Sequence, residues 1–296
     1  MAIRIDRKTC AVYTYSLSVA SLRSLLLPTH IRLAVNSAPP NDSQSGSTFR
    51  FYEELNDFLS PELRKRPFLQ RFSGTPSVKD TIEAIGIPHT EIDLILVDGV
   101  SVDFSYLLKG GEHVSVYPVF ERLDIGPITR LRPQPLREPR FVLDVHLGRL
   151  ARYLRLIGLD SLYRNDYSDE QIVKLSVHEH RTILTRDRGI LKRSAVTHGY
   201  WLRHTTPREQ LAEVVRVFDL WDRIAPFRRC MECNGELRPA DRADVLDRVP
   251  PGAARDFDAF SECTECGRVY WRGSHYDRLA SLVRELLRDA PRASCD

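Results

Sequence analysis

Polar and apolar positions follow two different patterns along the chain, with a change near residue 140. In residues 48–125 they alternate in the manner of strands, at 48–54, 66–72, 91–97 and within 107–118. Ser77 can cap one helix, which Gly86 ends. The order of two strands, a helix and two further strands predicts a β-grasp domain.

Residues 140–226 show a regular exchange of short apolar runs and amphipathic stretches. The runs predict strands at 140–145, 160–163, 181–185 and 200–203. The stretches between and after them predict helices at 147–157, 168–178, 189–197 and 206–220, several with N-capping residues at their starts. Such β/α alternation predicts a parallel sheet flanked by helices.

The remaining segments are a linker, an N-terminal extension and a C-terminal segment that contains cysteine pairs. Residues 126–139 contain four prolines and predict a stiff linker. Residues 1–47 end in a polar stretch too poor in apolar groups to pack, so we expect a disordered extension or an upstream start codon, and a signal peptide is the weaker alternative. Residues 227–296 hold two C-x-x-C pairs and a helix predicted at 274–288.

Length and composition narrow the class of protein. The 296 residues suffice for two or three domains. No apolar run reaches the ~18 residues that a membrane helix needs, so we expect no membrane partner. The net charge of +3 indicates no partner by itself. Paired C-x-x-C spacing favours metal over disulfides and therefore a reducing, cytoplasmic setting.

Acidic residues follow two of the predicted parallel strands. Asp144 ends the first strand and Asp187 follows the third, and ligands of such sheets bind outside the carboxyl ends of the strands. Asp169 begins a helix between them in sequence. Converging carboxylates suit Mg²⁺ or Mn²⁺, which activates water at a phosphodiester. The sequence therefore predicts catalytic roles for Asp144, Asp187 and Asp169, with Asp144 and Asp187 as ligands of the catalytic metal.

Purely structural roles are open for some acids. Asp169 and its neighbour Glu170 lie in a first helical turn, where the helix dipole favours acids whatever the function. Asp160 follows Gly158 and can simply shape a turn.

Basic residues outnumber acidic ones around these acids. Residues 140–228 hold 16 Lys and Arg against 11 Asp and Glu, although a solvated charged face is the ordinary explanation of such a surplus. Arginine beside acidic metal ligands is the charge layout of a protein that reads the phosphate backbone. The predicted nucleic-acid contacts are Arg149, Arg152, Arg155, Arg186 and Arg188.

The cysteines give the most specific signal. The two C-x-x-C pairs, here called knuckles, have the spacing of a tetrahedral zinc site. Each is followed by a residue that permits a tight turn after the second cysteine. The 29 residues between the knuckles imply an inserted loop. The predicted ligands of a structural Zn²⁺ are Cys230, Cys233, Cys263 and Cys266.

The run Phe141–Asp160, the motif Thr185-Arg-Asp-Arg188, the C-x-x-C pairs and Val269–His275 together resemble the Mut-seven C-terminal RNase family. The resemblance implies a PIN-like nuclease domain at 140–226, a zinc ribbon with a terminal helix at 227–296, and the ubiquitin-like domain that can precede them at 48–125. It matches Asp144 and Asp187 to acidic active-site positions, and Asp169 less closely.

The segment Leu107–Pro118 is also similar to the end of ubiquitin-like sulfur carriers. Those carriers need a free C-terminal Gly-Gly, whereas here Gly110 and Gly111 lie inside a predicted turn and the chain continues. We therefore expect the β-grasp domain to dock a protein partner or orient a substrate.

A function of the β-grasp domain itself, as a sulfur-transfer or ubiquitin-like partner adaptor, is one hypothesis, and the missing C-terminal Gly-Gly argues against its carrier form. Two further functions from different classes are compatible with the sequence. The first is a metal-dependent ribonuclease that hydrolyses RNA. The alternative is a non-catalytic RNA-binding module, associated with tRNA or ribosomes, with a β-grasp domain for partner docking. Metal-dependent cleavage of a mixed RNA pool separates the two.

Overall fold

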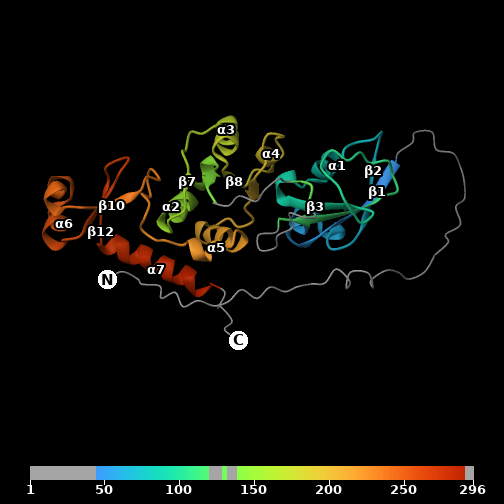
Figure 1. Ribbon diagram of the computed structural model, residues 1–296. Coiled ribbons are helices and arrows are strands. Elements are labelled where there is room, and N and C mark those ends of the chain that lie inside the picture. The colour runs from blue at the N-terminus through green and yellow to red at the C-terminus, as the bar shows by residue number, and fades with distance from the viewer. Residues whose placement is uncertain (1–44, 120–128, 132–138, 291–296) are drawn as a thin grey trace, which may run out of the picture. The chain divides into compact units, whose positions relative to one another are not determined.

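The computed structural model describes residues 45–119, 129–131 and 139–290 (Figure 1). The extension expected at 1–47 lies outside the described residues except for its last three, and so does most of the linker expected at 126–139. None of the helices in the described ranges is long and apolar enough to cross a membrane.

The N-terminal domain is built on a five-stranded sheet with the order β2-β1-β5-β3-β4. Strands β1 and β5 pair in parallel, and the other pairs are antiparallel. This confirms the predicted β-grasp domain and adds the short β4, which the sequence did not predict. The strands are β1 (Ser45–Phe51), β2 (Phe68–Phe72), β3 (Ile92–Val97), β4 (Val100–Ser101) and β5 (His113–Pro118).

One helix and several short 3₁₀ turns complete this domain. Helix α1 (Val78–Ile85) starts where the Ser77 hydroxyl accepts a hydrogen bond from the Asp80 backbone N–H, and it ends at Gly86, whose φ of 118° requires glycine. The apolar face of α1 packs on the sheet against side chains such as Phe49. The turns η2 (Glu53–Phe58) and η4 (His89–Glu91) flank the sheet.

A second sheet, of four parallel strands, forms the α/β domain and confirms the predicted alternation. Its order is β7-β6-β8-β9. The two central strands are buried throughout, as expected for a sheet covered on both faces. The strands are β6 (Phe141–Leu143), β7 (Ser161–Leu162), β8 (Thr182–Thr185) and β9 (Gly199–Trp201).

Helices follow each strand of this sheet. They are η5 (Val145–Leu147) with α2 (Gly148–Leu156), then α3 (Asp169–Glu179), α4 (Arg188–Leu191) and α5 (Pro207–Val217). Helix α3 has the predicted capping box of Ser168 and Gln171. The helix predicted at 189–197 is only the short α4, because the backbone tightens into bonds from Lys192 to Gly189 and from Arg193 to Ile190.

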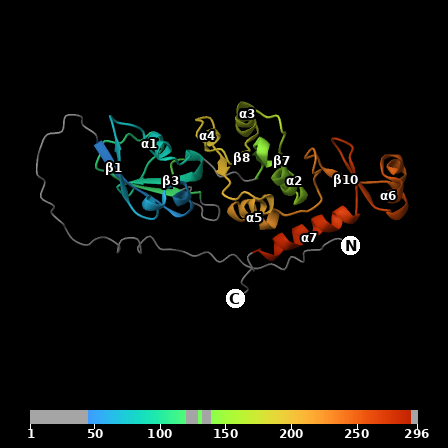
Figure 2. The ribbon, with the colours of Figure 1, turned by 180° about the vertical axis from the view of Figure 1, so that it is seen from behind.

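Two apolar cores lie on the two sides of the sheet. Helices α3 and α4 contribute Ile172 and Leu191 to one of them. Helices α2 and α5 contribute to the other, and so does α7 (Ser274–Arg288) through Leu282, Val283 and Leu286. Figures 1 and 2 show α7 running alongside α5. The helix predicted near the end of the sequence is therefore part of the core of the α/β domain.

A three-stranded antiparallel ribbon carries the four knuckle cysteines. Its order is β10-β11-β12, formed by β10 (Leu237–Ala240), β11 (Phe260–Cys263) and β12 (Val269–Trp271). The segment between β10 and β11 contains α6 (Pro251–Asp256) and has a small apolar core around Val245 and Phe260. This folded insertion accounts for the long spacing between the knuckles.

Candidate active site and metal centre

Asp144 and Asp187 lie at the same edge of the parallel sheet. Asp144 follows β6 and caps η5, and Asp187 follows β8 and caps α4. Because β6 and β8 are neighbours that pair Leu143 with Leu184, both acids stand at the carboxyl ends of adjacent strands. This is the edge at which parallel α/β sheets bind ligands.

The carboxylate of Asp144 is largely buried, with 7% of the residue exposed. Its Oδ1 accepts a hydrogen bond from the Val145 N–H (2.6 Å), and its Oδ2 accepts one from the Thr185 hydroxyl (2.6 Å). The Nδ1 atom of His146 lies 3.4 Å from Oδ2. The fully buried Thr185 hydroxyl also accepts a hydrogen bond from the Asp187 N–H (2.8 Å). One side chain, for which the sequence predicted no role of its own, thus joins the two acids.

Asp187 and Asp169 have different surroundings. The exposed Asp187 accepts a hydrogen bond from the Gly189 N–H (2.7 Å). The Oδ2 atom of Asp169 accepts one from Arg193 (3.1 Å), and its side chain is 48% exposed in the first turn of α3. Among the described residues, no three acidic or histidine ligand atoms come within 4.8 Å of one another. The structure therefore links Asp144 with Asp187 but does not bring Asp169 into a three-acid group.

A cavity of about 450 Å³ opens beside Asp144 at this edge. Its lining includes His146, Arg149, Tyr163 and Arg186. The Tyr163 hydroxyl donates to the Val145 carbonyl (2.8 Å), and a Cβ at Gly148 would lie 2.7 Å from that hydroxyl oxygen, so the close packing here requires glycine. The cavity carries positive charge without a balancing acid in its lining, which suits a phosphate group.

The five arginines predicted to contact nucleic acid separate into different environments. Arg149 and Arg186 line the cavity. Arg152 pairs with Glu232 (2.8 Å) and stays 55% exposed. The guanidinium of Arg188 lies 4.1 Å from the centre of the Trp201 ring, where burial lowers its pKa and the nearby charge of Arg203 lowers it further.

The prediction that Arg155 contacts RNA is contradicted by its burial, since only 2% of the residue is exposed. Its guanidinium donates to the backbone carbonyls of Ser161 (2.8 Å) and Glu232 (2.6 Å), so its hydrogen bonds are made inside the protein and not to RNA. The physical reason is helical geometry. Each residue of an α-helix is turned by about 100° around the helix axis, so Arg152 lies about 60° and Arg155 about 120° away from Arg149.

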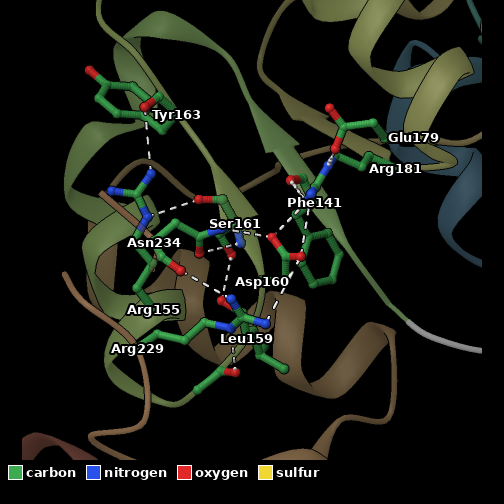
Figure 3. A network of polar contacts seen from close by, with 11 residues as sticks. Phe141, Arg155, Leu159, Asp160, Ser161, Tyr163, Glu179, Arg181, Arg229 and Asn234 are labelled. Carbon is green, nitrogen blue, oxygen red and sulfur yellow. Dashed lines mark hydrogen bonds and ion pairs between the residues drawn. The ribbon is translucent and has the colours of Figure 1, made fainter. Parts of the chain in front are cut away.

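Arg155 belongs to a polar network that joins the sheet to the first cysteine knuckle (Figure 3). Asp160 accepts hydrogen bonds from Arg181 (2.7 Å) and from the Asn234 amide (2.8 Å), and the Ser161 N–H donates to Asn234 (2.9 Å). Burial alone would raise the pKa of Asp160, but these two donors lower it. Asp160 does more than shape a turn, because it connects β7 and β8 to residues of the ribbon.

The four knuckle cysteines converge as predicted. Their sulfur atoms all lie within 4.8 Å of one another, with 3.7 Å between Cys230 and Cys266 and 3.3 Å between Cys233 and Cys263. A tetrahedral zinc ion about 2.3 Å from each sulfur holds them about 3.8 Å apart, so the donor set fits such a metal. A Cβ at Gly235 would lie 2.8 Å from the Cys263 sulfur, so this cradle also requires glycine.

Hydrogen bonds around the knuckles favour the thiolate form of one ligand. The Tyr270 hydroxyl lies 3.0 Å from the Cys230 sulfur. Burial raises the pKa of Cys230, but the Tyr270 hydroxyl and backbone N–H groups outweigh burial and lower it to about 7. Metal ligands must be deprotonated, so this contact prepares the site.

Comparison with protein families matches both parts of the chain. Residues 139–283 match the model of the Mut7-C RNAse domain, and residues 45–124 match that of the Mut7-C ubiquitin domain. The chain therefore carries a Mut7-C RNAse domain behind a Mut7-C ubiquitin domain. The family predicted from the sequence is confirmed. No curated protein and no solved structure matches the chain.

The match to the Mut7-C RNAse domain includes both the parallel sheet with Asp144 and Asp187 and the four cysteines of the ribbon. It ends at residue 283, within α7, which packs on the same core. The Mut7-C RNAse domain thus comprises the α/β sheet and the ribbon, in agreement with the polar network that joins them.

Proposed function

We propose that the protein is a divalent-metal-dependent ribonuclease that hydrolyses RNA at the carboxyl edge of the parallel sheet. The observation that carries this proposal is the Thr185 hydroxyl, which links Asp144 to Asp187 beside a cationic cavity. A pair of fixed acids next to arginines provides both attraction for a phosphodiester and ligands for a hard cation.

Asp144 and Asp187 would hold Mg²⁺ or Mn²⁺, which supplies an activated water and neutralises phosphate charge when bound. Mg²⁺ commonly uses one or two protein carboxylates together with substrate phosphates and water, so two acids are a sufficient set. Asp169 would have to give up its ion pair with Arg193 to join them. We therefore place Asp144 and Asp187 at the centre of the proposed site and Asp169 at its margin.

The arginines of the cavity would hold the RNA. Arg149 and Arg186 are exposed and line the cavity, so their guanidinium groups can reach phosphates. Arg152 lies on the same helix but is partly neutralised by Glu232. The cysteine centre would bind a structural Zn²⁺, because a site with four protein ligands leaves no position for water.

The experiment is incubation of the full chain with total RNA in the presence of Mn²⁺, Mg²⁺ or a chelator, beside the Asp144→Asn variant. Cleavage that needs the divalent ion and is lost in the variant supports the proposal. An Asp166→Asn variant is the matched control, because Asp166 is an exposed acid paired with Arg164 (2.7 Å).

A non-catalytic RNA-binding module is the second candidate function. It is favoured by the lack of a three-acid group among the described residues, since many metal-dependent nucleases gather more acids than two. In that case RNA would bind through Arg149 and Arg186 with no metal-dependent cleavage. The same incubation, combined with a binding assay, decides between the two.

A further inference from the structure

The surface of the ubiquitin domain around η2 and η4 contacts the RNAse domain, and the described residues of both domains belong to one compact unit. The contact centres on Glu91, whose exposure is only 4%. Its Oε1 accepts a hydrogen bond from the Trp201 backbone N–H (2.6 Å), and its Oε2 accepts one from Arg203 (3.0 Å). A buried carboxylate with both oxygens engaged by another domain is a specific contact, because an unpaired one would be costly.

The strand that Glu91 contacts is the edge strand of the parallel sheet. Among the described strands, β9 pairs with β8 alone, and this pairing places Trp201 opposite Thr185. Glu91 accepts a hydrogen bond from the Trp201 N–H on the side of β9 that faces away from β8, where the described residues place no further strand. The ubiquitin domain thereby fixes the strand next to the one that ends at the proposed active site.

Trp201 also contacts the loop that carries Asp187, so it connects this loop to the ubiquitin domain. Its indole N–H donates to the Arg186 carbonyl (3.2 Å), and its ring lies under the Arg188 guanidinium. Phe58 of the ubiquitin domain packs against Trp201 (4.9 Å between ring centres) and also lies 4.8 Å from Arg188. The residues on both sides of Asp187 are therefore held by Trp201, and Trp201 is held by Glu91 and Phe58.

Two further bonds fix the segment that follows α4. The Nε2 atom of His89 lies 2.7 Å from the Val196 carbonyl, and Lys192 donates to the Glu83 carbonyl (2.7 Å). The loop of Asp187 and α4 is thus attached to the ubiquitin domain on both of its sides.

We propose that the ubiquitin domain is an internal clamp of the nuclease site, in which Glu91 and Phe58 are positioning residues that set the loop of Asp187 through Trp201. The effect of the clamp on RNA cleavage rests on the proposed function, whereas the clamp itself rests only on the contacts between the two domains. It assigns the η2–η4 surface to contacts within the chain, so a protein partner of this domain would have to use another surface.

Hydrogen exchange of the full chain tests the clamp without any RNA. Glu91→Ala should raise exchange about tenfold at the amide of Trp201 and at those of Asp187 and Gly189, which donate to the Thr185 hydroxyl and the Asp187 carboxylate. Glu91→Gln should restore most of the protection, since its amide oxygen can still accept from Trp201. Phe58→Leu gives a second, milder loss of the same contact.

Glu112→Gln is the matched control. Glu112 is also a buried carboxylate of the ubiquitin domain, but it bonds to Ser47, Lys109 and Gly110 of its own domain. It should lower the melting temperature while leaving exchange at Asp187 and Gly189 unchanged. Unchanged exchange at these two amides in Glu91→Ala, or an equal rise in Glu112→Gln, would overturn the clamp.

Cleavage kinetics add the catalytic consequence. Glu91→Ala should lower kcat about tenfold with KM within about twofold, whereas Glu112→Gln should leave kcat at 20 °C close to wild type. A wild-type chain that cleaves no RNA refutes the proposed function, while the exchange result still decides the clamp. An altered exchange pattern with unchanged kcat in an active enzyme refutes the positioning role.

Discussion

The Thr185 hydroxyl donates a 2.6 Å hydrogen bond to Oδ2 of Asp144, deep at the end of β8. The same oxygen accepts a hydrogen bond from the backbone N–H of Asp187 (2.8 Å). One buried hydroxyl thus bonds both to the carboxylate that follows β6 and to the backbone of the acid that follows β8. Orientation of both acids therefore depends on a hydroxyl that need not touch the substrate.

Thr185→Val keeps the shape of the side chain and removes this hydroxyl. We expect the free energy of unfolding to fall by about 1–3 kcal/mol, because a buried carboxylate and a backbone donor lose their partner. Metal-dependent cleavage should fall as well. Urea denaturation measures the stability, and Thr185→Ser, which retains the hydroxyl, should lie close to wild type. A valine variant as stable and active as wild type contradicts the role assigned to Thr185.

Asp144→Asn and Asp187→Asn should each abolish metal-dependent cleavage while RNA binding persists or tightens. Loss of a carboxylate weakens the hold on the cation, and it also removes negative charge that faces a polyanion. Cleavage gels and fluorescence anisotropy with a labelled RNA measure the two effects separately. Weaker binding in both variants would instead indicate that these acids organise the RNA surface.

Arg149→Ala and Arg186→Ala should weaken RNA binding and reduce the slope of log affinity against log salt by about one unit for each lost phosphate contact. Arg152→Ala should have a smaller effect, because Glu232 already neutralises part of its charge. Binding titrations at several salt concentrations measure the slopes. Equal losses for Arg149 and Arg152 would mean that the cavity is not the preferred RNA contact.

Asp160 should make the stability of the RNAse domain sensitive to acid. Since Arg181 and Asn234 lower its pKa in the folded state, its contribution to stability is complete above the pKa of the unfolded chain and is lost as the pH falls through the lower folded value. Asp160→Ala should cost about 3 kcal/mol at pH 7 and flatten this acid dependence, because Arg181 loses a buried partner. Thermal denaturation as a function of pH measures both effects.

Removal of the metal should lower exchange protection in the parallel sheet as well as in the ribbon. The full chain should contain one zinc ion, lost in Cys230→Ser, as elemental analysis can show. Because Arg155 donates to the carbonyls of Met231 and Glu232 within the first knuckle, exchange protection should also fall at Ser161 in β7. The amides of β1 in the ubiquitin domain should keep their protection. A zinc-free chain with unchanged protection at Ser161 would show that the ribbon and sheet are independent.

Local signals in the sequence predicted most of the fold. The capping box of Ser168 and Gln171 marked the start of α3, and the C-x-x-C spacing identified four cysteines that the structure brings together. These features depend on neighbouring residues, so they can be read from a linear chain.

Contacts between distant residues could not be predicted in the same way. Arg155 has the same spacing as Arg149 and Arg152 and differs only in its position around the helix and in the ribbon carbonyls that meet it. Thr185 resembles any threonine of a buried strand until Asp144 is placed opposite its hydroxyl. Glu91 is one of many acids in the sequence, and its contact with Trp201 joins two domains.

The packing of α7 on the core of the RNAse domain bears on how the chain emerges from the ribosome. Leu282, Val283 and Leu286 cover apolar side chains of α2 and α5, which are synthesised much earlier. All buried apolar residues of the ubiquitin domain's core lie between Phe49 and Val116, so this core can form before the RNAse domain is synthesised, although Trp201 later packs against it. The parallel sheet must wait with part of its apolar surface exposed until α7 arrives, so the folded ubiquitin domain is the first surface on which the nascent sheet can assemble.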